Sequence, residues 1–379
     1  MILKQHISRG MFVVSCLLST VTMSSFATAD CPLKYSPFSI DMPVSDVFRS
    51  SAAKEVLQRY APDLGKGLSA NFGGTELPPP FANIMSPRIL LQIEGVKLSA
   101  EQLQALEHEL QNVPVTAEDQ QLRCQRYDNE RIELPATIQH PAILVFEKIT
   151  GFRDEPSVNA AQVAIKNLAK QNNWQLVFSD KAGVFNLEDL AKFDAIIWNN
   201  VSGDALTLTQ RAAFKRYLQQ GGGYVGIHGS AGDPAYFWDW YPDELISARF
   251  IGHPSEPQFQ TARVQLESHQ PLLSHKLDAN WSLNEEWYSF AQSPRVKGAH
   301  IIASLDETSY SPVGFGHSLA MGDHPIAWAK CMGPARVFYT AIGHLPEVYA
   351  DKNSLQLLEN GIEWSLNLDN LPCQESLTQ

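Results

Sequence analysis

The pattern of apolar and polar positions changes character near Pro141. Before that point apolar residues recur at helical spacing, and after it short continuous apolar runs alternate with helical segments. Continuous apolar runs predict strands that are covered on both faces, as in a parallel sheet. Four such runs stand at Ala142–Phe146, Trp174–Phe178, Ala195–Trp198 and Tyr224–Ile227. Their alternation with helical segments predicts an α/β fold with a doubly wound, mainly parallel sheet.

The helical segments between these runs have clear signals. Leu187–Leu190 begins a short helix, and Thr209–Leu218 carries its large apolar side chains on one side. The glycines Gly221 to Gly223 end that second helix, because glycine accepts the left-handed conformation of a helix C-terminus. Each strand is therefore followed by a segment that can cross over to the next parallel strand.

The pattern shifts again past Gly252. Strands are expected at Thr261–Leu266 and His300–Ser304, and a hairpin at Pro325–Cys331 and Arg336–Ile342 around a turn with Gly333 and Pro334. A last helix is expected at Ser354–Ser365.

The region before Pro141 is predicted to be helical. Ser45 and Asp46 can cap a helix that runs towards Tyr60, and Ser99 with Gln102 forms a capping box. We therefore expect a helical accessory domain over 30–135, an α/β domain over 140–368 and a C-terminal tail over 369–379.

The first residues have the pattern of an export signal. Lys4 and Arg9 precede the apolar stretch Met11–Val21, and Ala27 to Ala29 is a small-residue cleavage site. A retained anchor is the alternative, but the stretch is short and interrupted by serine and threonine. We expect a signal peptide over 1–29, a periplasmic or secreted protein, and no membrane association after cleavage.

Charge and cysteine content restrict the partners and the compartment. The net charge is −12, and removal of the cations Lys4 and Arg9 takes it to about −14, which disfavours nucleic acid and anionic membranes as partners. A small neutral or cationic ligand fits better. The even number of remaining cysteines suits an oxidising compartment. Pairing Cys31 with Cys124 and Cys331 with Cys373 would staple each region locally, but the sequence leaves three connectivities open.

Candidate chemistry follows the strands, because open parallel sheets bind ligands beyond the carboxyl ends of their strands. His228 lies in the string Gly226-Ile227-His228-Gly229-Ser230, directly after the fourth run. A functional side chain between small residues at such a turn has the pattern of a nucleophile elbow, where backbone N–H groups can also hold an oxyanion. The alternative is a histidine that only hydrogen-bonds within its loop.

Further strings add titratable and aromatic groups. Glu285-Glu286-Trp287-Tyr288 sets two acids beside two aromatic rings, and a carboxylate in such surroundings can serve as an acid or a base. Eight of the eleven histidines lie between His228 and His344. Histidine suits proton transfer and metal binding, but no metal-ligand spacing appears along the chain. We therefore expect no cofactor, with a metal ion possible but not favoured.

At these residues the chain resembles the ThuA-like (trehalose utilisation) family, whose fold is the flavodoxin-like fold of class I glutamine amidotransferases. The resemblance covers about 142–366. The strings that carry it run from Gly221 to His228, from Glu285 to Tyr288, from His324 to Trp328 and from Arg336 to Thr340, with Phe250, His253-Pro254 and Gly343-His344.

The resemblance implies a role for His228. Class I amidotransferases hold a cysteine nucleophile at this elbow, and their His-Pro-Glu string is similar to His344-Leu345-Pro346-Glu347 with one residue inserted. Glutamine hydrolysis through a thioester is therefore not expected. The chain departs from the family at Asp154, where a histidine is usual, and at Gln270, which interrupts a usual His-Pro.

These arguments give a set of candidate site residues. The expected catalytic residues are His228, Glu286, His344 and Glu347. The expected substrate-binding residues are Arg153, Asn199, Asp233, Trp238, Trp240, His253, Trp287, Tyr288 and His324.

The sequence leaves three functions open. The family resemblance implies an enzyme that acts on a carbohydrate, such as a disaccharide or a keto-sugar derivative, by His/Glu acid–base chemistry. The alternatives are a non-catalytic sugar-binding protein on a degenerate amidotransferase scaffold and a metal-dependent hydrolase.

Overall fold

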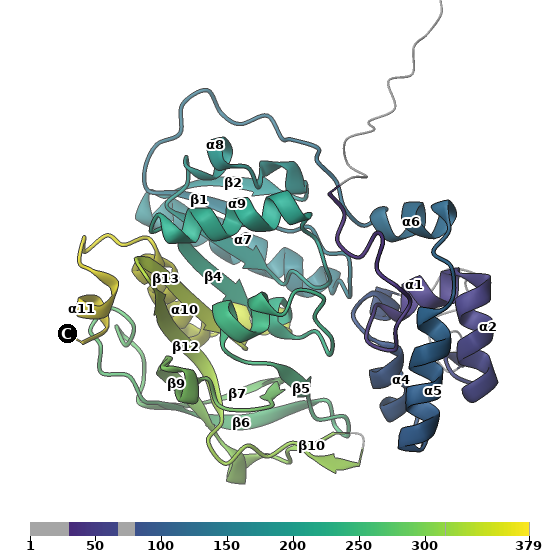
Figure 1. Ribbon diagram of the computed structural model, residues 1–379. Helices are drawn as coiled ribbons and strands as arrows, with labels where there is room; N and C mark the ends of the chain where they lie inside the picture. The colour runs from purple at the N-terminus through teal and green to yellow at the C-terminus, as the bar shows by residue number, and fades with distance from the viewer. Residues whose placement is uncertain (1–29, 67–79, 315, 379) are drawn as a thin grey trace, which may run out of the picture.

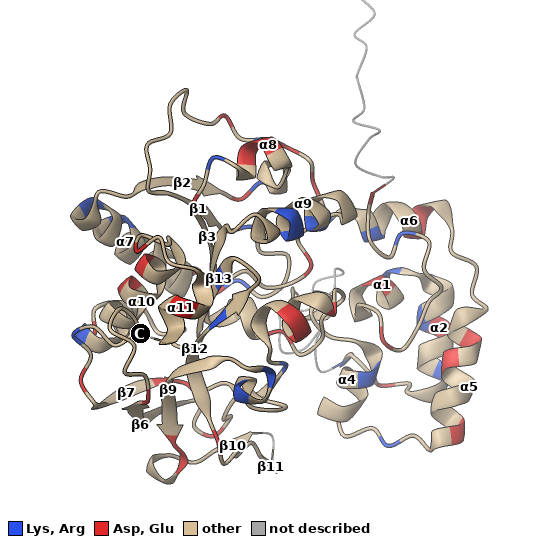
Figure 2. Ribbon diagram, turned by 60° about the vertical axis from the view of Figure 1, so that its left-hand side comes forward, with Lys and Arg blue, Asp and Glu red and all other residues tan. Residues whose placement is uncertain are grey.

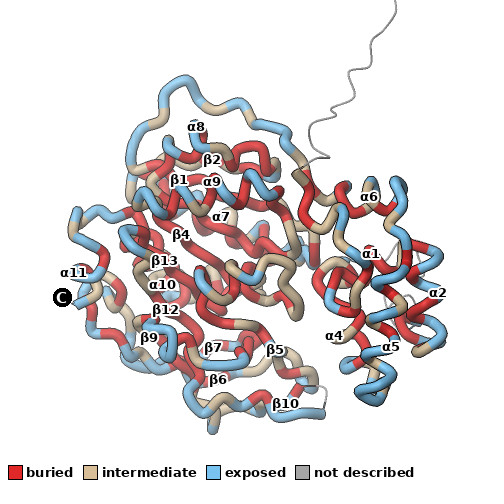
Figure 3. The backbone as a smooth tube through the Cα atoms, viewed as in Figure 1, coloured by how far each residue is buried: buried red, intermediate tan, exposed pale blue. Residues whose placement is uncertain are grey.

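A computed structural model describes residues 30–66, 80–314 and 316–378 (Figure 1). The expected signal peptide, 1–29, lies outside the described residues. A group of helices near the N-terminus stands beside a larger unit built around one sheet. The strands of that sheet are among the most deeply buried parts of the chain, and exposed backbone lies mainly on helices and loops (Figure 3).

The central sheet has nine strands in the order β2-β1-β3-β4-β13-β12-β9-β6-β7. Neighbours from β2 to β13 pair in parallel, and those from β13 to β7 pair antiparallel. Its strands are β1 (Ala142–Phe146), β2 (Gln175–Ser179), β3 (Ala195–Asn199), β4 (Gly223–Ile227), β6 (Phe259–Leu266), β7 (Asn280–Glu286), β9 (His300–Asp306), β12 (Pro325–Met332) and β13 (Ala335–Thr340). The expected α/β sheet is confirmed, with an antiparallel half formed by the later strands.

Two small sheets lie outside the central one. They pair β5 (Phe250–Gly252) with β8 (Ser289–Phe290), and β10 (Val313–Gly314) with β11 (His317–Ser318).

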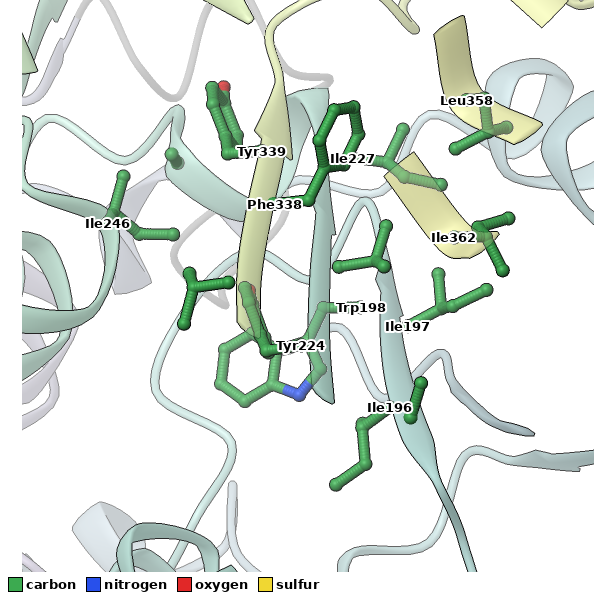
Figure 4. Packing of buried hydrophobic residues seen from close by; sticks show 14 of the residues in the cluster. Ile196, Ile197, Trp198, Tyr224, Ile227, Ile246, Phe338, Tyr339, Leu358 and Ile362 are labelled. Atoms are coloured by element: carbon green, nitrogen blue, oxygen red, sulfur yellow. The ribbon is translucent and has the colours of Figure 1, made fainter. Parts of the chain in front are cut away.

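Helices cover both faces of the parallel strands. They are α7 (Glu155–Asn172), α8 (Leu187–Leu190), α9 (Leu208–Gln219) and α10 (Lys352–Ser365), with α11 (Cys373–Thr378) at the C-terminal end. On one face Trp198 stacks on Phe214 of α9, with ring centroids 5.7 Å apart. On the other face Ile197 points towards Ile362 of α10 (Figure 4). Successive side chains along each strand point to opposite faces of the sheet, so they fill an apolar layer on each face, as a doubly wound fold requires.

The N-terminal helices enclose their own apolar cluster, which includes Phe38, Leu57 and Leu106. They are α1 (Val44–Arg49), α2 (Ser51–Tyr60), α4 (Pro87–Ile93), α5 (Ala100–Gln111) and α6 (Ala117–Cys124), with the short 3₁₀ helix η1 (Pro80–Asn83). The capping box of Ser99 and Gln102 is present. The expected domain boundaries stay predictions.

The prediction of one helix capped by Ser45 and Asp46 is wrong. Two helices occupy this stretch, and they are separated at Ser50, whose backbone is extended. Asp46 lies inside the first helix and forms a buried ion pair with Arg126, so its carboxylate serves a tertiary contact instead of a cap.

Two disulfides join Cys31 to Cys124 and Cys331 to Cys373. Of the three connectivities that the sequence allows, the local pairing is the one present.

Among the described residues, no helix has the length and apolar character needed to cross a membrane. Lys and Arg are distributed over α4, α7 and α9 among other elements (Figure 2).

Candidate active site

His228 stands at a sharp turn between β4 and the 3₁₀ helix η3 (His228–Ala231). Its φ is +36°, a left-handed value that residues other than glycine seldom adopt. Two contacts hold it there: the Tyr339 hydroxyl donates to the His228 carbonyl at 2.9 Å, and Nδ1 lies 2.7 Å from the Ala341 carbonyl. Since a carbonyl only accepts, Nδ1 carries the proton and Nε2 presents its lone pair to the site.

Three side chains from separate elements meet at this turn. His228 Nε2 lies 3.2 Å from His344 Nδ1 and 3.3 Å from Glu286 Oε2, and His344 Nδ1 lies 3.0 Å from the same carboxylate oxygen. The side chains of His228 and Glu286 are each 3% exposed. We call His228, Glu286 and His344 the site cluster.

Glu285 anchors the loop that carries His344. Its carboxylate, 0% exposed, accepts hydrogen bonds from the backbone N–H groups of Gly343, His344 and Leu345 at 3.2–3.3 Å. Although β7 is an edge strand, its carboxyl end therefore lies against the loop that follows β13. This contact sets Glu286 and His344 side by side.

Gly343 allows the same loop to approach the elbow. Its φ is +151°, and a Cβ there would stand 3.0 Å from His228 Cβ and 2.8 Å from the Tyr349 hydroxyl. Any larger residue would therefore push the loop away from His228.

Burial and mutual contacts shift the pKa values in the site cluster. Burial opposes the charge on Glu286, but the contacts with His228 and His344 outweigh it and hold the pKa well below its usual range. Burial lowers the pKa of His228. For His344, burial is outweighed by the hydrogen bond to Glu286, and the pKa is raised. Burial raises the pKa of Glu285 to about 8.

The site cluster lies at one side of a cavity of about 360 Å³, a size that suits a small ligand. The lining also includes Phe81, Ile84, Phe152, Asp154, Ser157, Asn200, Ser202, Gly229, Gly232, Asp233, Pro234, Phe250, His253, Gln258, Phe259 and Tyr288. Aromatic rings and a few polar groups thus face the same space as the two histidines and the carboxylate.

The N-terminal helical region contributes to this cavity. The Phe81 ring stacks on Phe152, with centroids 4.7 Å apart. Asn83 donates to the Thr150 carbonyl at 2.7 Å, and the Ile84 carbonyl accepts from the Ala235 N–H at 3.0 Å. The helical region is therefore fixed to the loops after β1 and β4 at the cavity.

Tyr288 and Asp233 form further parts of the wall. The Tyr288 ring stacks on the His228 ring, with centroids 4.1 Å apart. Asp233 accepts from the Ser202 hydroxyl at 2.6 Å and from the Gly203 N–H at 2.8 Å. Burial raises the pKa of Asp233 to about 7.

Several residues expected from the sequence are brought together here. His228, Glu286, His344, Asp233, His253 and Tyr288 all line the cavity. His253 Nδ1 lies 3.4 Å from Glu286 Oε1.

Glu347, Arg153 and Asn199 do not line the cavity. Glu347 is exposed on the 3₁₀ helix η7 (Pro346–Tyr349), and Glu286 takes the place expected for it beside His344. Arg153 donates to the carboxylate of Glu155 and to a backbone carbonyl. Asn199 is buried, and its amide donates to Glu147 and to the Val158 carbonyl, so it supports the loop next to Asn200.

The remaining candidates, Trp238, Trp240, Trp287 and His324, do not line the cavity either. Trp238 and Trp240 stack on each other with centroids 4.9 Å apart, beside α9. Trp287 is fully buried and donates to the Gln260 carbonyl at 2.7 Å. His324 lies between Glu307 and the Tyr288 carbonyl, at 2.7 and 2.9 Å. It thereby supports the strand end that carries Tyr288.

The expected oxyanion donor at the elbow is already engaged. The Gly229 N–H donates to Asn200 Oδ1 at 3.0 Å. The sequence also missed Phe81, Ile84, Gln258 and Phe259, which come from segments with no motif. The sequence before Gln258 and the proline run before Phe81 contain no pattern that predicts a ligand pocket.

The side chains of the site cluster determine which chemistry the site can perform. Two imidazoles and a carboxylate can transfer protons, and the same three residues are also close enough to hold a metal ion together. All four cysteines of the described residues are in disulfides, so none of them offers a thiolate. A cysteine-based acyl transfer therefore has no nucleophile among these residues.

The chain is similar to a known family and to solved structures. The family model described as "ThuA: Trehalose utilisation" matches residues 142–365. A solved ThuA-like protein from Bacteroides uniformis is similar at 25% identity and a TM-score of 0.52, over 62% of this chain and 95% of that chain. A ThuA-like protein from Parabacteroides merdae shares 16% identity at a TM-score of 0.45, over 60% and 90% of the two chains. No curated protein matches.

Proposed function

Since the chain belongs to the trehalose-utilisation (ThuA) family, we propose that it acts on a carbohydrate, either a disaccharide or a keto-sugar derivative, by acid–base chemistry at the site cluster. His228 and Glu286 handle the proton, and His344 orients or polarises the substrate.

The observation that carries this proposal is the meeting of His228, Glu286 and His344 at the wall of one cavity. General acid–base catalysis needs groups of this kind within reach of the substrate. The three nearest heteroatoms lie 3.0–3.3 Å apart, so one substrate hydroxyl or carbonyl can contact more than one of them.

The cavity wall fits a sugar. The rings of Phe152, Phe250 and Tyr288 offer apolar surface for the C–H faces of a pyranose, and Asp233 with Asn200 offers polar groups for its hydroxyls. This combination of flat apolar and polar wall supports a carbohydrate over a purely apolar ligand.

Glutamine amidotransfer is not proposed, because histidine stands at the elbow and the four described cysteines are paired.

We also propose that the protein works outside the cytoplasm. The two disulfides suit an oxidising compartment, and residues 1–29 have the pattern of a signal peptide.

The test is turnover of a panel of disaccharides and keto-sugars, with products identified by mass spectrometry. His228→Ala and His344→Asn are each expected to reduce the rate at least about 100-fold, the usual scale for loss of a proton-transfer group. The exposed His275, changed to Gln, is the matched control and should keep the full rate. Thermal unfolding checks that each variant is folded.

Full activity in a folded His228→Ala variant would exclude the proposed chemistry. If the wild-type protein binds a sugar of the panel and never changes it, the protein is instead a sugar-binding protein.

A further inference from the structure

We propose that the site cluster is a binding site for one divalent transition-metal ion, with zinc the best match, ligated by His228 Nε2, Glu286 Oε2 and His344 Nδ1. A bound ion would occupy the lone pairs that the carbohydrate proposal uses for proton transfer, so the two proposals are tested separately, and metal binding is measured without any substrate.

The spacing of the three atoms fits a common ion. They are separated by 3.0, 3.2 and 3.3 Å. Ligands of a tetrahedral zinc ion, with bonds of about 2.0–2.2 Å, stand about 3.3–3.5 Å apart. The triangle would therefore open by only a few tenths of an ångström to admit the ion.

Outer contacts already orient His228 and Glu286, and a carboxylate lies near the third ligand. The Nδ1–H group of His228 donates to the Ala341 carbonyl at 2.7 Å. His344 Nε2 faces the Asp154 carboxylate at 4.0 Å, and Glu286 Oε1 accepts from the Gln258 amide. Metal-binding imidazoles regularly direct their second nitrogen at a carbonyl or a carboxylate, and this contact fixes the tautomer.

The three inner atoms need a positive group between them. The lone pair of His228 Nε2 faces a carboxylate oxygen, and both side chains are 3% exposed, so bulk water cannot separate them. A shared proton can satisfy one of the three contacts at a time. A divalent cation satisfies all three at once.

The fourth side of the cluster is open to the cavity, which all three residues line. Three protein ligands of the set His, His and Glu, with one open position, are typical of catalytic zinc sites, where the ion polarises a carbonyl or activates water. Two imidazoles make Mg²⁺ a poor match, because that ion prefers oxygen ligands.

Calorimetric titration of the chelator-treated protein with Zn²⁺, and separately with Mg²⁺, tests the site. We expect one Zn²⁺ per chain and no measurable Mg²⁺ binding. His344→Ala and Glu286→Gln should each weaken Zn²⁺ binding at least about 100-fold. The exposed His275→Gln variant, which removes an imidazole elsewhere, should bind as the wild type does. Two ligand variants are used because either one alone could misfold, which thermal unfolding reveals.

A second measurement replaces zinc with Co²⁺, whose visible absorption is strong in four- or five-coordinate sites and weak in six-coordinate ones. A strong band that is lost in both ligand variants supports the site. Absence of stoichiometric Zn²⁺ binding, or binding that is unchanged in a folded ligand variant, overturns the proposal.

The two proposals fail separately. Stoichiometric zinc without any turnover of the sugar panel leaves the metal site and removes the proposed function. Turnover by a folded protein that binds no stoichiometric Zn²⁺ leaves the function and removes the metal site.

Discussion

At the residue scale, hydrogen bonds hold His228 in a strained backbone conformation at the site. A non-glycine residue at positive φ costs on the order of 1–3 kcal/mol, and here the φ is +36°. Hydrogen bonds at its carbonyl and at Nδ1 tie both ends of the residue to β13 and the loop after it. The ring is thus fixed with Nε2 towards Glu286 and His344.

Asp233 is the residue with the clearest consequence for stability. Its carboxylate is buried, it accepts hydrogen bonds from Ser202 and Gly203, and the neighbouring charge of Asp204 adds to the effect of burial. Its pKa rises from 3.8 to about 7. A raised pKa means that the folded protein takes up a proton between these values, so stability falls as the pH rises through this window.

We predict that Asp233→Asn removes this dependence. Relative to the wild type, the variant should gain stability from pH 4.5 to pH 7.5, by at most about 4 kcal/mol. The measurement is urea unfolding of both proteins at several pH values. Asp180→Asn, which removes a carboxylate from an exposed position, is the control and should show no such gain. A constant difference between Asp233→Asn and wild type across the range would refute the assignment.

At the element scale, the site depends on the contact between the end of β7 and the loop after β13. Glu285 makes that contact with the backbone of residues 343–345, and its neighbour Glu286 enters the site cluster. In a strand, successive side chains point to opposite faces. One carboxylate therefore binds the loop while the next one faces the cavity.

Glu285→Ala should separate these two roles. Loss of the acceptor leaves backbone N–H groups of the loop without partners, which costs roughly 2–4 kcal/mol of stability. The displaced His344 should also lower activity towards any substrate found. Glu285→Gln keeps one acceptor oxygen and a similar shape, so it should recover most of the stability. Thermal unfolding with parallel rate measurements checks both effects, and a fully active Glu285→Ala protein would contradict the positioning role.

At the scale of the whole molecule, the N-terminal helical region is part of the cavity. The Phe81 ring stacks on Phe152. Hydrogen bonds join Asn83 to Thr150 and Ala235 to Ile84. The Cys31–Cys124 disulfide ties the two ends of this region together. The family match begins only at residue 142, so this part of the wall lies outside the matched residues.

Phe81→Ala should therefore change substrate affinity and leave the chemistry intact. Loss of the ring removes apolar wall and its stacking on Phe152, and KM should rise about 5- to 20-fold with kcat within twofold. Steady-state kinetics or a sugar-binding titration measures the effect. Tyr35→Ala, 68% exposed on the same region, is the control. An unchanged KM in Phe81→Ala would show that the ring does not meet the substrate.

The sequence by itself determined the parallel strands of the α/β unit and the helices between them, because apolar runs and capping signals act over a few neighbouring residues, whereas the edge strand β7 was not expected. The parallel strands from Ala142 to Ile227 begin and end within a residue or two of their expected bounds. It also placed His228 at the elbow and His344 after the last strand, since strand ends are local features. The helix at Ser45 was misread because Asp46 serves a distant arginine.

Only the tertiary structure decided which acid joins the two histidines. Glu347 is three residues from His344 in the chain but exposed, whereas Glu286 is 58 residues away and 3.0 Å distant. No local pattern encodes that choice, because it depends on how the antiparallel strands turn the end of β7 towards the loop after β13. The same holds for Phe81, which enters the cavity through packing between two regions. Long-range packing, and not spacing along the chain, assembled the site.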